Sequence, residues 1–390
     1  MIIPQKHLPV NWTDGMKVNK EHFIATENFT IDHLRDVASV GINSFNFGLL
    51  PPLKGSGAQL SNYEITKTAT DQIRIRVSHC QAITPGGVRI ALSSDDGISQ
   101  DAITETIQLE DTGSAGLLDG KEDHYYIILV VDPFARTPSG NPDPEEIPIR
   151  QPHIQPAYKL QLVHTNNVNV DQLGGYHLVI GRIVRNGMDY TKDESFVPPC
   201  STITSSELLM RYYQSTGKAL EEIQQLSLQI IGKINYKNQQ SEIAQNIKRM
   251  CRTLLDFTSE HYFYFRNMAH QQPPVHLVRA ISSLASYVYT GLQVLPEKEK
   301  EELLNYFFEW SDISPVVFMK KLTGIIELNY SHYEVGSYVK SIEDLLDAMV
   351  LIWRKLNTLE YIGQHKENIV VKEEVLAQAV KERKGWSILD

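Results

Sequence analysis

The pattern of hydrophobic and polar residues along the chain changes near residue 200. Before that point the period is two: in residues 72–79, Ile73, Ile75 and Val77 alternate with arginines. Successive side chains of a strand point to opposite faces, so this alternation predicts a strand with one buried face. After residue 203 the apolar residues recur every three or four positions, which is typical of amphipathic helices. The chain is therefore predicted to be an α+β protein with at least two domains.

The first half contains several such strand patterns separated by turn residues. We expect strands after the Pro-Gly-Gly turn at residues 85–87, at 125–131 (ended by an Asp-Pro pair), at 157–163 and at 176–188. Short strands divided by Gly, Pro and Asn are typical of antiparallel β-sandwiches and barrels. Residues 1–202 are accordingly predicted to form an antiparallel β-sandwich.

Residues 137–156 interrupt this pattern with many prolines and acidic residues. Proline cannot donate to a sheet ladder, so an exposed extended arm is expected here. Ile147, Ile149 and Ile154 are spaced between the prolines, and burial of their apolar side chains would be favourable. Two interpretations stay open: the arm lies against another chain, or it folds back and hides these isoleucines on its own sandwich.

Residues 203–357 are predicted to form a helical bundle. Thr204 and Glu207 resemble a capping box, and the first helix should begin there. Further helices are expected around residues 243–257, after the proline pair at 273–274, and over 297–310, 315–328 and 342–356. Pro198 and Pro199 disfavour helix and predict a stiff elbow, so the two halves should fold as separate units joined near residues 197–202.

The first of these helices carries a narrow apolar seam with heptad spacing. Its members are Leu209, Tyr212, Thr216, Ala219, Ile223, Leu226 and Ile230. Stripes of this kind usually pack within their own chain, which is the first interpretation. The second is that the seam also joins copies of the chain in a homo-oligomer. The two interpretations are compatible.

Composition and charge exclude several classes of protein. The chain has 390 residues, 42% hydrophobic residues and a formal net charge of -10, with a pI of about 5.7. An acidic chain is a poor candidate for binding nucleic acid. Its three cysteines are far apart, which favours free thiols in a reducing compartment. The N-terminus has no apolar signal segment, and no apolar run approaches the roughly 20 residues of a membrane span. We expect a cytoplasmic protein without direct membrane insertion.

Motifs for catalysis, metal binding and cofactor binding are missing from the sequence. Phosphate loops, dinucleotide fingerprints, nucleophile elbows and zinc-binding helix motifs do not occur. We therefore predict no catalytic, metal or cofactor-binding residues, and a component of an assembly and not an enzyme. The alternative is a β-sandwich that binds or cleaves glycans and carries a helical oligomerisation domain. That class needs a concave patch with exposed aromatic residues and paired carboxylates.

The N-terminal segment carries a set of residues that resembles a known family. Trp12 is followed by Gly15 and Met16, and then by the pair His22 and Phe23. Three further stretches have matching order and spacing: Phe-Gly-Leu-Leu at 47–50, Phe-Val-Pro-Pro-Cys at 196–200, and Tyr330 with His332 before a late helix. Together these motifs, from about residue 8 to about 357, resemble TssK, a baseplate protein family of type VI secretion.

The resemblance implies a structural adaptor without catalysis. Members of the family are homotrimers with a β-sandwich shoulder that faces baseplate wedge proteins of the TssF/TssG kind, a helical neck that trimerises, and a C-terminal head that contacts a membrane complex. This chain would then be cytoplasmic and docked at the inner membrane through partners. It departs from the family at Lys20 and Glu21, where Pro-Gln is usual. It also has only a short polar tail at 358–390, so the head looks reduced or absent and the membrane anchor non-standard.

The N-terminal motif residues are too sparse to build a core. Trp12, Met16 and Phe23 could anchor an N-terminal arm in pockets of a partner or neighbouring protomer, with Gly15 permitting a tight bend. The alternative is that they close the bottom of the chain's own sandwich. The sequence leaves both interpretations open.

Overall fold

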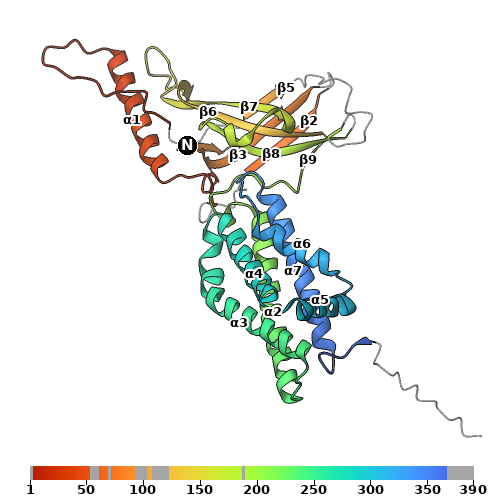
Figure 1. Ribbon diagram of the computed structural model, residues 1–390. Coiled ribbons are helices and arrows are strands. Elements are labelled where there is room, and N and C mark those ends of the chain that lie inside the picture. Colours follow the sequence, from red (N-terminus) through yellow and green to blue (C-terminus); the bar gives the residue numbers. More distant parts are fainter. Residues whose placement is uncertain are drawn as a thin grey trace, which may run out of the picture.

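The computed structural model describes residues 3–52, 61–68, 72–93, 103–107, 123–186 and 189–366. They form two units that are joined end to end: a sheet-rich N-terminal unit and a helical bundle (Figure 1). The predicted α+β class with an antiparallel sheet unit followed by helices is confirmed.

Two antiparallel sheets make up the N-terminal unit. The first contains β1 (Gly48–Leu49), β2 (Ser61–Lys67), β3 (Ile73–Ile83), β4 (Arg89–Ser93) and β5 (Ile103–Ile107), and all four other strands pair with β3. The second has the order β7-β6-β8-β9. Its strands are β6 (Asp123–Ser139), β7 (His153–His164), β8 (His177–Asn186) and β9 (Asp189–Lys192).

The inner faces of the two sheets pack on a common core, as in a β-sandwich. Ile73, Ile75 and Val77 of β3 are buried and the arginines between them are exposed, as their alternation predicts. The sheets also meet at one edge, where the Leu160 backbone amide donates to Glu105 Oε1 at 3.0 Å. This core includes residues 125–129 of β6.

The sequence analysis missed a helix in this unit. Helix α1 (Lys20–Val40) lies beside the sandwich, and a short connecting segment leads from it to β1 (Figure 1). Its buried residues are Asp32, Arg35 and Ser39, which are all polar. An amphipathic helix is recognised from an apolar face that turns inward, and α1 lacks that pattern. The first 202 residues are therefore not purely β.

The predicted arm at 137–156 is shorter than expected. β6 continues past the Asp132–Pro133 pair, where its end was predicted, through an irregularity between Asp132 and Thr137. Thr137 to Ser139 then pair with β7 up to His153, so only the connection between them is a loop. β7 is an edge strand, where proline is tolerated because one side of the ladder needs no partner.

In the part of the chain that the structure describes, six helices form the bundle. They are α2 (Glu207–Tyr236), α3 (Glu242–Asn267), α4 (Val275–Gln293), α5 (Glu297–Ser311), α6 (Pro315–Ile326) and α7 (Val335–Thr358). The predicted start of the first helix at Thr204 is wrong. Ser206 is the N-cap, and its side chain accepts from the Leu209 amide, because the three residues before it form a tight 3-10 turn.

The apolar seam of α2 is filled by the chain itself. Ile223, Leu226 and Ile230 are buried in the core of the bundle, and Ala219 packs against that core. Leu209 and Tyr212 belong to the cluster shared with the sandwich. The proposed homo-oligomer seam is corrected accordingly, because its central side chains have almost no free surface to offer a second copy.

The two units share one hydrophobic cluster at their joint. Leu209, Leu277, Val335 and Val339, all from helices, lie in the same cluster as the sandwich core. The linker is also tied to β1: the Leu49 amide donates to the Pro199 carbonyl, and the Ser201 amide donates to the Leu49 carbonyl, both at 2.8 Å. Independent folding of residues 1–202 stays a prediction, and such a fragment would lose these helix contacts.

The predicted polar tail begins with a segment that packs on the bundle. Ile362 is buried and its amide donates to Gln239 Oε1 at 3.0 Å. The next amide, of Gly363, donates to the Tyr306 hydroxyl at 2.9 Å. The expectation of a reduced head rests mainly on residues 367–390, which lie outside the described residues.

Candidate interaction surfaces

A buried ion pair fixes helix α1 to the start of the chain. Arg35 donates to Asp32 Oδ1 through Nη2 at 2.8 Å and through Nε at 3.0 Å, and the same Nη2 donates to the Ile3 carbonyl at 3.0 Å. The backbone amides of Lys6 and His7 donate to Asp32 Oδ2. Removing one member of a buried pair costs roughly 3–5 kcal/mol, so this cluster holds α1 firmly.

The charge of Asp32 is stabilised by these contacts. Burial alone would raise the pKa of this carboxyl, but the hydrogen bonds from His7, Lys6 and Arg35 outweigh burial and lower the pKa below its ordinary value. The helix also approaches the turn between β3 and β4 closely. Gly87 has φ +85°, and a Cβ there would lie 2.6 Å from the Arg35 carbonyl oxygen. The polar face of α1 is thus the face that its own chain covers.

The N-terminal motif residues form a tip at the start of α1. Asn19 caps the helix: its side chain accepts from the His22 amide, and its own amide donates to His22 Nδ1. Gly15 has φ +79°, so the expected bend is present. The ring of Trp12 lies 5.9 Å from that of His22, which folds the loop back onto the helix.

The tip does not close the sandwich. Trp12 and Phe23 are more than half exposed, and Met16 is half-buried and outside the core cluster of the sandwich. The interpretation that these residues seal the bottom of their own sandwich is therefore wrong. A role in an interface stays a prediction.

The outer face of α1 is apolar. Four of its large side chains are more than half exposed: Phe23 (60%), Leu34 (62%), Val37 (59%) and Val40 (79%). Successive residues of a helix are about 100° apart, so Leu34 and Val37, each two positions after a member of the buried pair, point away from it. Helix α1 thus buries polar residues and exposes large apolar ones, beside exposed polar residues such as Glu27 and His33. Exposed apolar surface is typical of interaction sites, so this face is a candidate contact surface.

The shortened arm lies at the same end of the sandwich as α1. Arg136, just before it, forms an ion pair with Glu27 of α1 at 2.6 Å. Ile147 is 94% exposed, Ile149 is 67% exposed and Ile154 is also exposed. The interpretation that the arm hides these isoleucines on its own sandwich is wrong, and contact with another chain stays a prediction.

Replacing Ile147 and Ile149 together by serine should leave the fold unchanged and weaken assembly. Both side chains face solvent, so the far-UV circular dichroism spectrum and melting temperature should stay within the range of ordinary surface variants. Binding to the assembly partner, measured by co-purification, should fall. Loss of the native β-sheet spectrum would instead show that the arm is internal packing.

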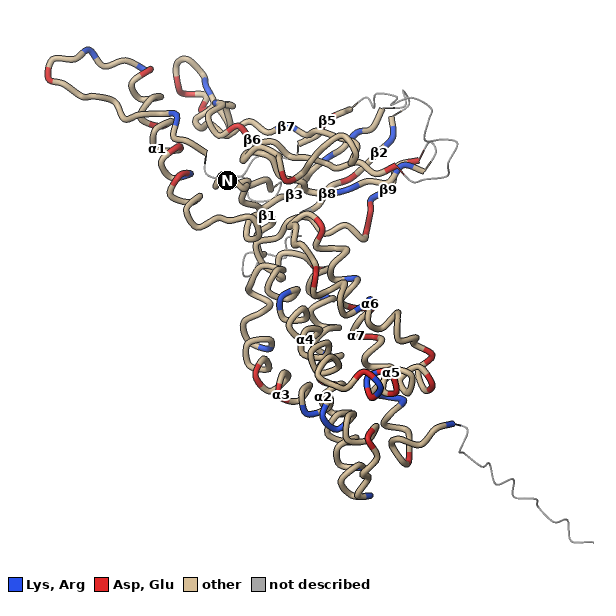
Figure 2. Tube along the Cα trace, in the orientation of Figure 1, with Lys and Arg blue, Asp and Glu red and all other residues tan. Residues whose placement is uncertain are grey.

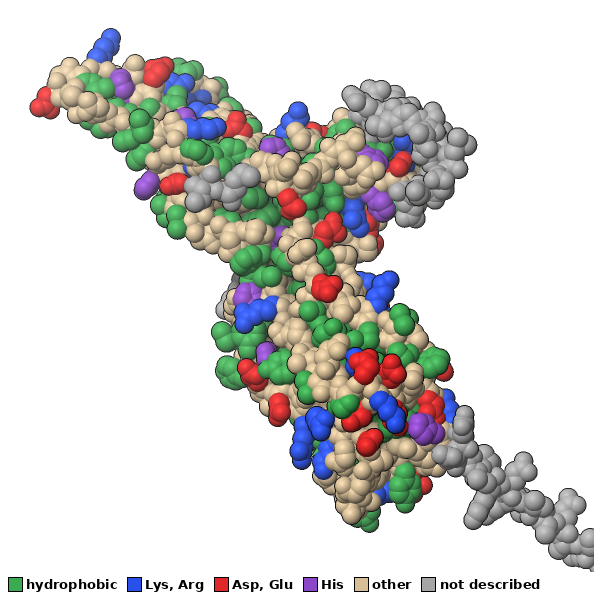
Figure 3. All heavy atoms as spheres, in the orientation of Figure 1, with side chains coloured by type: hydrophobic (Ala, Val, Ile, Leu, Met, Phe, Trp, Pro, Cys, Tyr) green, Lys and Arg blue, Asp and Glu red, His purple; other side chains and the backbone are tan. Residues whose placement is uncertain are grey.

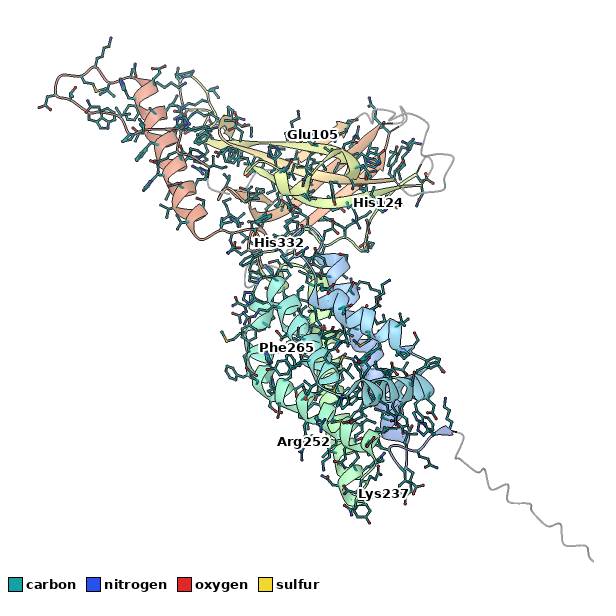
Figure 4. The ribbon with its side chains drawn as sticks, in the orientation of Figure 1. Glu105, His124, Lys237, Arg252, Phe265 and His332 are labelled. Carbon is teal, nitrogen blue, oxygen red and sulfur yellow. The ribbon has the colours of Figure 1, made fainter. Side chains whose placement is uncertain are left out.

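A groove of about 460 Å³ runs between α2 and α3. The residues that line it include the aromatic Tyr213, Phe257, His261, Tyr262 and Phe265 and the charged Lys218, Glu221 and Arg266. The rings of Tyr213 and Phe265 stack at 4.8 Å (Phe265 is labelled in Figure 4). Phe263 is exposed and lies two residues from both His261 and Phe265, which places it on the opposite side of α3 from the groove.

The remaining motif residues lie at the joint and are structural. His332 sits between the sandwich and the bundle (Figure 4). Its Nε2 lies 2.9 Å from the Phe47 carbonyl oxygen and its Nδ1 lies 2.9 Å from the Tyr330 hydroxyl. Val197 and Cys200 of the Pro-Pro motif are buried beside them. In the structure the motifs fall into two places, an exposed tip and a buried joint.

A metal-binding cluster is not found in the parts of the chain that the structure describes. Within those residues no three His, Cys, Asp or Glu side chains are grouped so that they could hold a metal ion. Tyr125 and Tyr126 are buried, so they cannot form the aromatic platform that a glycan site requires. Across the described ranges no helix combines the length and apolar character needed to cross a membrane.

Comparison with known proteins gives matches only among solved structures. No protein-family model matches the chain, and no curated protein matches it. A crystal structure of TssK aligns over 87% of this chain and 69% of its own, with 15% identity and a TM-score of 0.49. A chain of the TssK–TssF–TssG baseplate subcomplex of type VI secretion, solved by cryo-electron microscopy, aligns over 88% of this chain and 99% of its own, with 13% identity and a TM-score of 0.47.

A type VI secretion baseplate complex aligns over 75% of this chain and 91% of its own, with 14% identity and a TM-score of 0.45. The family that the sequence motifs resemble is therefore also the family of these solved structures.

Proposed function

We propose that this chain is a structural adaptor of a type VI secretion baseplate, which forms a homotrimer and links wedge proteins of the TssF/TssG kind to a membrane anchor. The observation that carries the proposal is the placement of the family motif. Trp12 and Phe23 are exposed at a capped and bent tip, where they contribute nothing to the core. Large aromatic side chains displayed in this way are typical anchors of protein interfaces.

Self-association is supported by a second surface. The α2–α3 groove is aromatic, and Phe263 projects from the opposite side of α3. A chain that carries a cavity on one side and a fitting side chain on another can pair head to tail, and three copies close into a ring if the rotation is 120°. The trimer is therefore proposed through the neck, at these residues and not at the buried seam.

The test is the double variant Trp12→Ser and Phe23→Ser, expressed and purified together with wedge proteins of the TssF/TssG kind. Recovery of the wedge proteins should fall at least about tenfold, because two interface anchors each contribute more than about 1 kcal/mol. The circular dichroism spectrum should not change. The matched control is Leu228→Ser, an exposed apolar residue of α2 far from the tip. Equal recovery of the wedge proteins with the wild type, the double variant and the Leu228→Ser control would refute the proposal.

A further inference from the structure

The first described residues of the chain bind between α1 and the sandwich (Figure 1). Residues 3–7 form this segment, the strap. The side chain of Ile3 lies in a slot between Gly86, in the turn between β3 and β4, and Gly175, which comes just before β8. A hydrogen bond of 2.8 Å from the Gly86 amide to the Gly175 carbonyl joins the two walls of the slot. The strap thus contacts two loops of the sandwich that are far apart in the sequence.

The slot exists because both of its walls are glycine. A Cβ at Gly175 would lie 2.4 Å from Ile3 Cδ1, and a Cβ at Gly86 would lie 2.5 Å from the same atom. Carbon atoms in favourable contact are about 3.5–4.0 Å apart, so a larger residue at either position would take the space of the Ile3 side chain. Neither glycine has a positive φ, so backbone conformation does not require glycine there. The two glycines instead leave room for one aliphatic side chain.

The backbone of the strap is bound by the ion pair of α1. The Ile3 carbonyl accepts from Arg35 Nη2 at 3.0 Å. The amides of Lys6 and His7 donate to the same oxygen, Oδ2, of Asp32. These are main-chain groups, which every peptide carries except for the amide of proline. The site therefore reads one side chain, the carbonyl of the same residue, and the amides three and four positions later.

Apolar packing does little to hold α1 against the sandwich. None of its residues belongs to the hydrophobic core of the sandwich, and hydrophobic side chains of the part that contains α1 lie at the surface of the molecule (Figure 3). The helix carries charges of both signs (Figure 2), and the two that are buried, Asp32 and Arg35, are those that bind the strap. Without the strap this buried pair would lose two amide donors and one carbonyl acceptor, which is costly for buried charges. The position of α1 therefore depends on the strap.

We infer that the glycine slot and the Asp32–Arg35 pair form a peptide-binding site, and that the strap is the segment that occupies it. The ligand class is a short peptide with an aliphatic side chain at the position of Ile3 and free amides three and four positions later. An occupied site fixes α1, and a vacated site releases it. The inference goes beyond the proposed function and does not depend on it, because every contact lies within one chain.

The first experiment weakens the strap in the full chain and measures hydrogen–deuterium exchange of α1. Ile3→Ser removes the aliphatic side chain from the slot, so exchange of the α1 amides should become at least about tenfold faster. The matched control is Leu8→Ser, which makes a similar change at an exposed position just after the strap and should keep the wild-type rate. The amides of α4, inside the bundle, should be unaffected in both variants.

The second experiment supplies the strap as a separate peptide. A synthetic peptide of residues 1–10 is added to the Ile3→Ser chain at about 1 mM, the order of the effective concentration of a segment on its own chain. It should return the exchange of α1 toward the wild-type rate. A peptide that carries Leu8→Ser should act equally well, and one that carries Ile3→Ser should need at least about tenfold more for the same effect.

The third experiment closes the slot. Gly175→Ala places a methyl group in the space of Ile3, so α1 should exchange as fast as in Ile3→Ser, and the wild-type peptide should not restore it. Combining the two substitutions should add little to either one, because both remove the same contact. Gly174→Ala is the neighbouring control: its Cβ would meet the His177 ring at 3.1 Å, not Ile3, and α1 should keep its protection.

Two results would overturn the inference. If α1 in Ile3→Ser is as protected as in the wild type, the strap does not hold the helix. If exchange rises but the wild-type peptide does not reverse it, or a peptide with Ile3→Ser reverses it equally well, the slot is not a peptide site. All three experiments use the isolated chain, so their failure would leave the baseplate proposal untouched, and loss of wedge-protein binding would not bear on them.

Discussion

Replacing Ile223 and Leu226 together by aspartate is expected to unfold the helical bundle, and not to separate folded subunits. Both side chains lie in the core of the bundle, at 0% and 9% exposure, and Arg354, the cation that α7 brings to this helix, is already paired with Glu222. An unpaired carboxylate in such a site costs several kcal/mol, against a total stability of about 5–15 kcal/mol for a typical domain. Circular dichroism at 25 °C should show most of the helical signal lost.

Milder substitutions make this expectation quantitative. Ile223→Ala should lower the free energy of unfolding by about 2–5 kcal/mol, since it removes buried methyl groups and leaves a cavity. Leu228→Asp, on the exposed side of the same helix, should change the free energy by no more than about 0.5 kcal/mol. A folded monomer from the Ile223/Leu226 double variant would contradict the prediction and restore the seam as a contact between copies.

The seam of α2 shows what heptad spacing can predict and what it cannot. Heptad spacing on α2 predicts correctly which side chains leave the solvent, because one face of a helix must be covered. It does not say whether the covering helix comes from the same chain. The answer depends on α7, more than 100 residues later, where Trp353 Nε1 donates to Ser227 Oγ at 3.0 Å. The strands were predictable for the same reason: alternation in β3 reports one buried face directly.

Helix α1 was missed because its burial is inverted. Residues that specify its position, Asp32 and Arg35, are of the kind that sequence patterns assign to solvent. Its only local signal was Asn19 with His22 as an unusual capping pair. The candidate surface was predictable at the tip, from the aromatic motif residues, but not along the helix. Along the rest of α1 the apolar residues do not alternate regularly with polar ones. An outward-facing apolar side could therefore not be recognised from the sequence.

The pH dependence of stability should report the joint through His332. Burial is the main cause that lowers the pKa of His332 to about 4. Its ring is 2% exposed, with one nitrogen at the Phe47 carbonyl and the other at the Tyr330 hydroxyl. These contacts suit the neutral imidazole, with Nε2–H donating to the carbonyl and the hydroxyl donating to Nδ1.

The sign of the effect follows from the two states. In the unfolded chain this histidine titrates near pH 6.5, whereas in the folded chain it takes up its proton only near pH 4. Between these values the unfolded state binds more protons, so the contribution of the neutral ring is complete above about pH 7 and is lost as the pH falls toward 4. The full difference of the two pKa values corresponds to about 3 kcal/mol.

The measurement is urea unfolding of the wild type and of His332→Gln between pH 4 and pH 7.5. Glutamine can donate to the Phe47 carbonyl but does not titrate, so the variant should keep the pH dependence of the other groups and lose the slope of about one proton that His332 supplies. His153→Gln, at an exposed position of β7, is the control and should retain the wild-type slope. Equal slopes for the wild type and His332→Gln would show that the ring is not held neutral at the joint. Acidification is thus expected to loosen the sandwich from the bundle, because the ring of Phe47, a member of the cluster that the two units share, lies 4.9 Å from this ring.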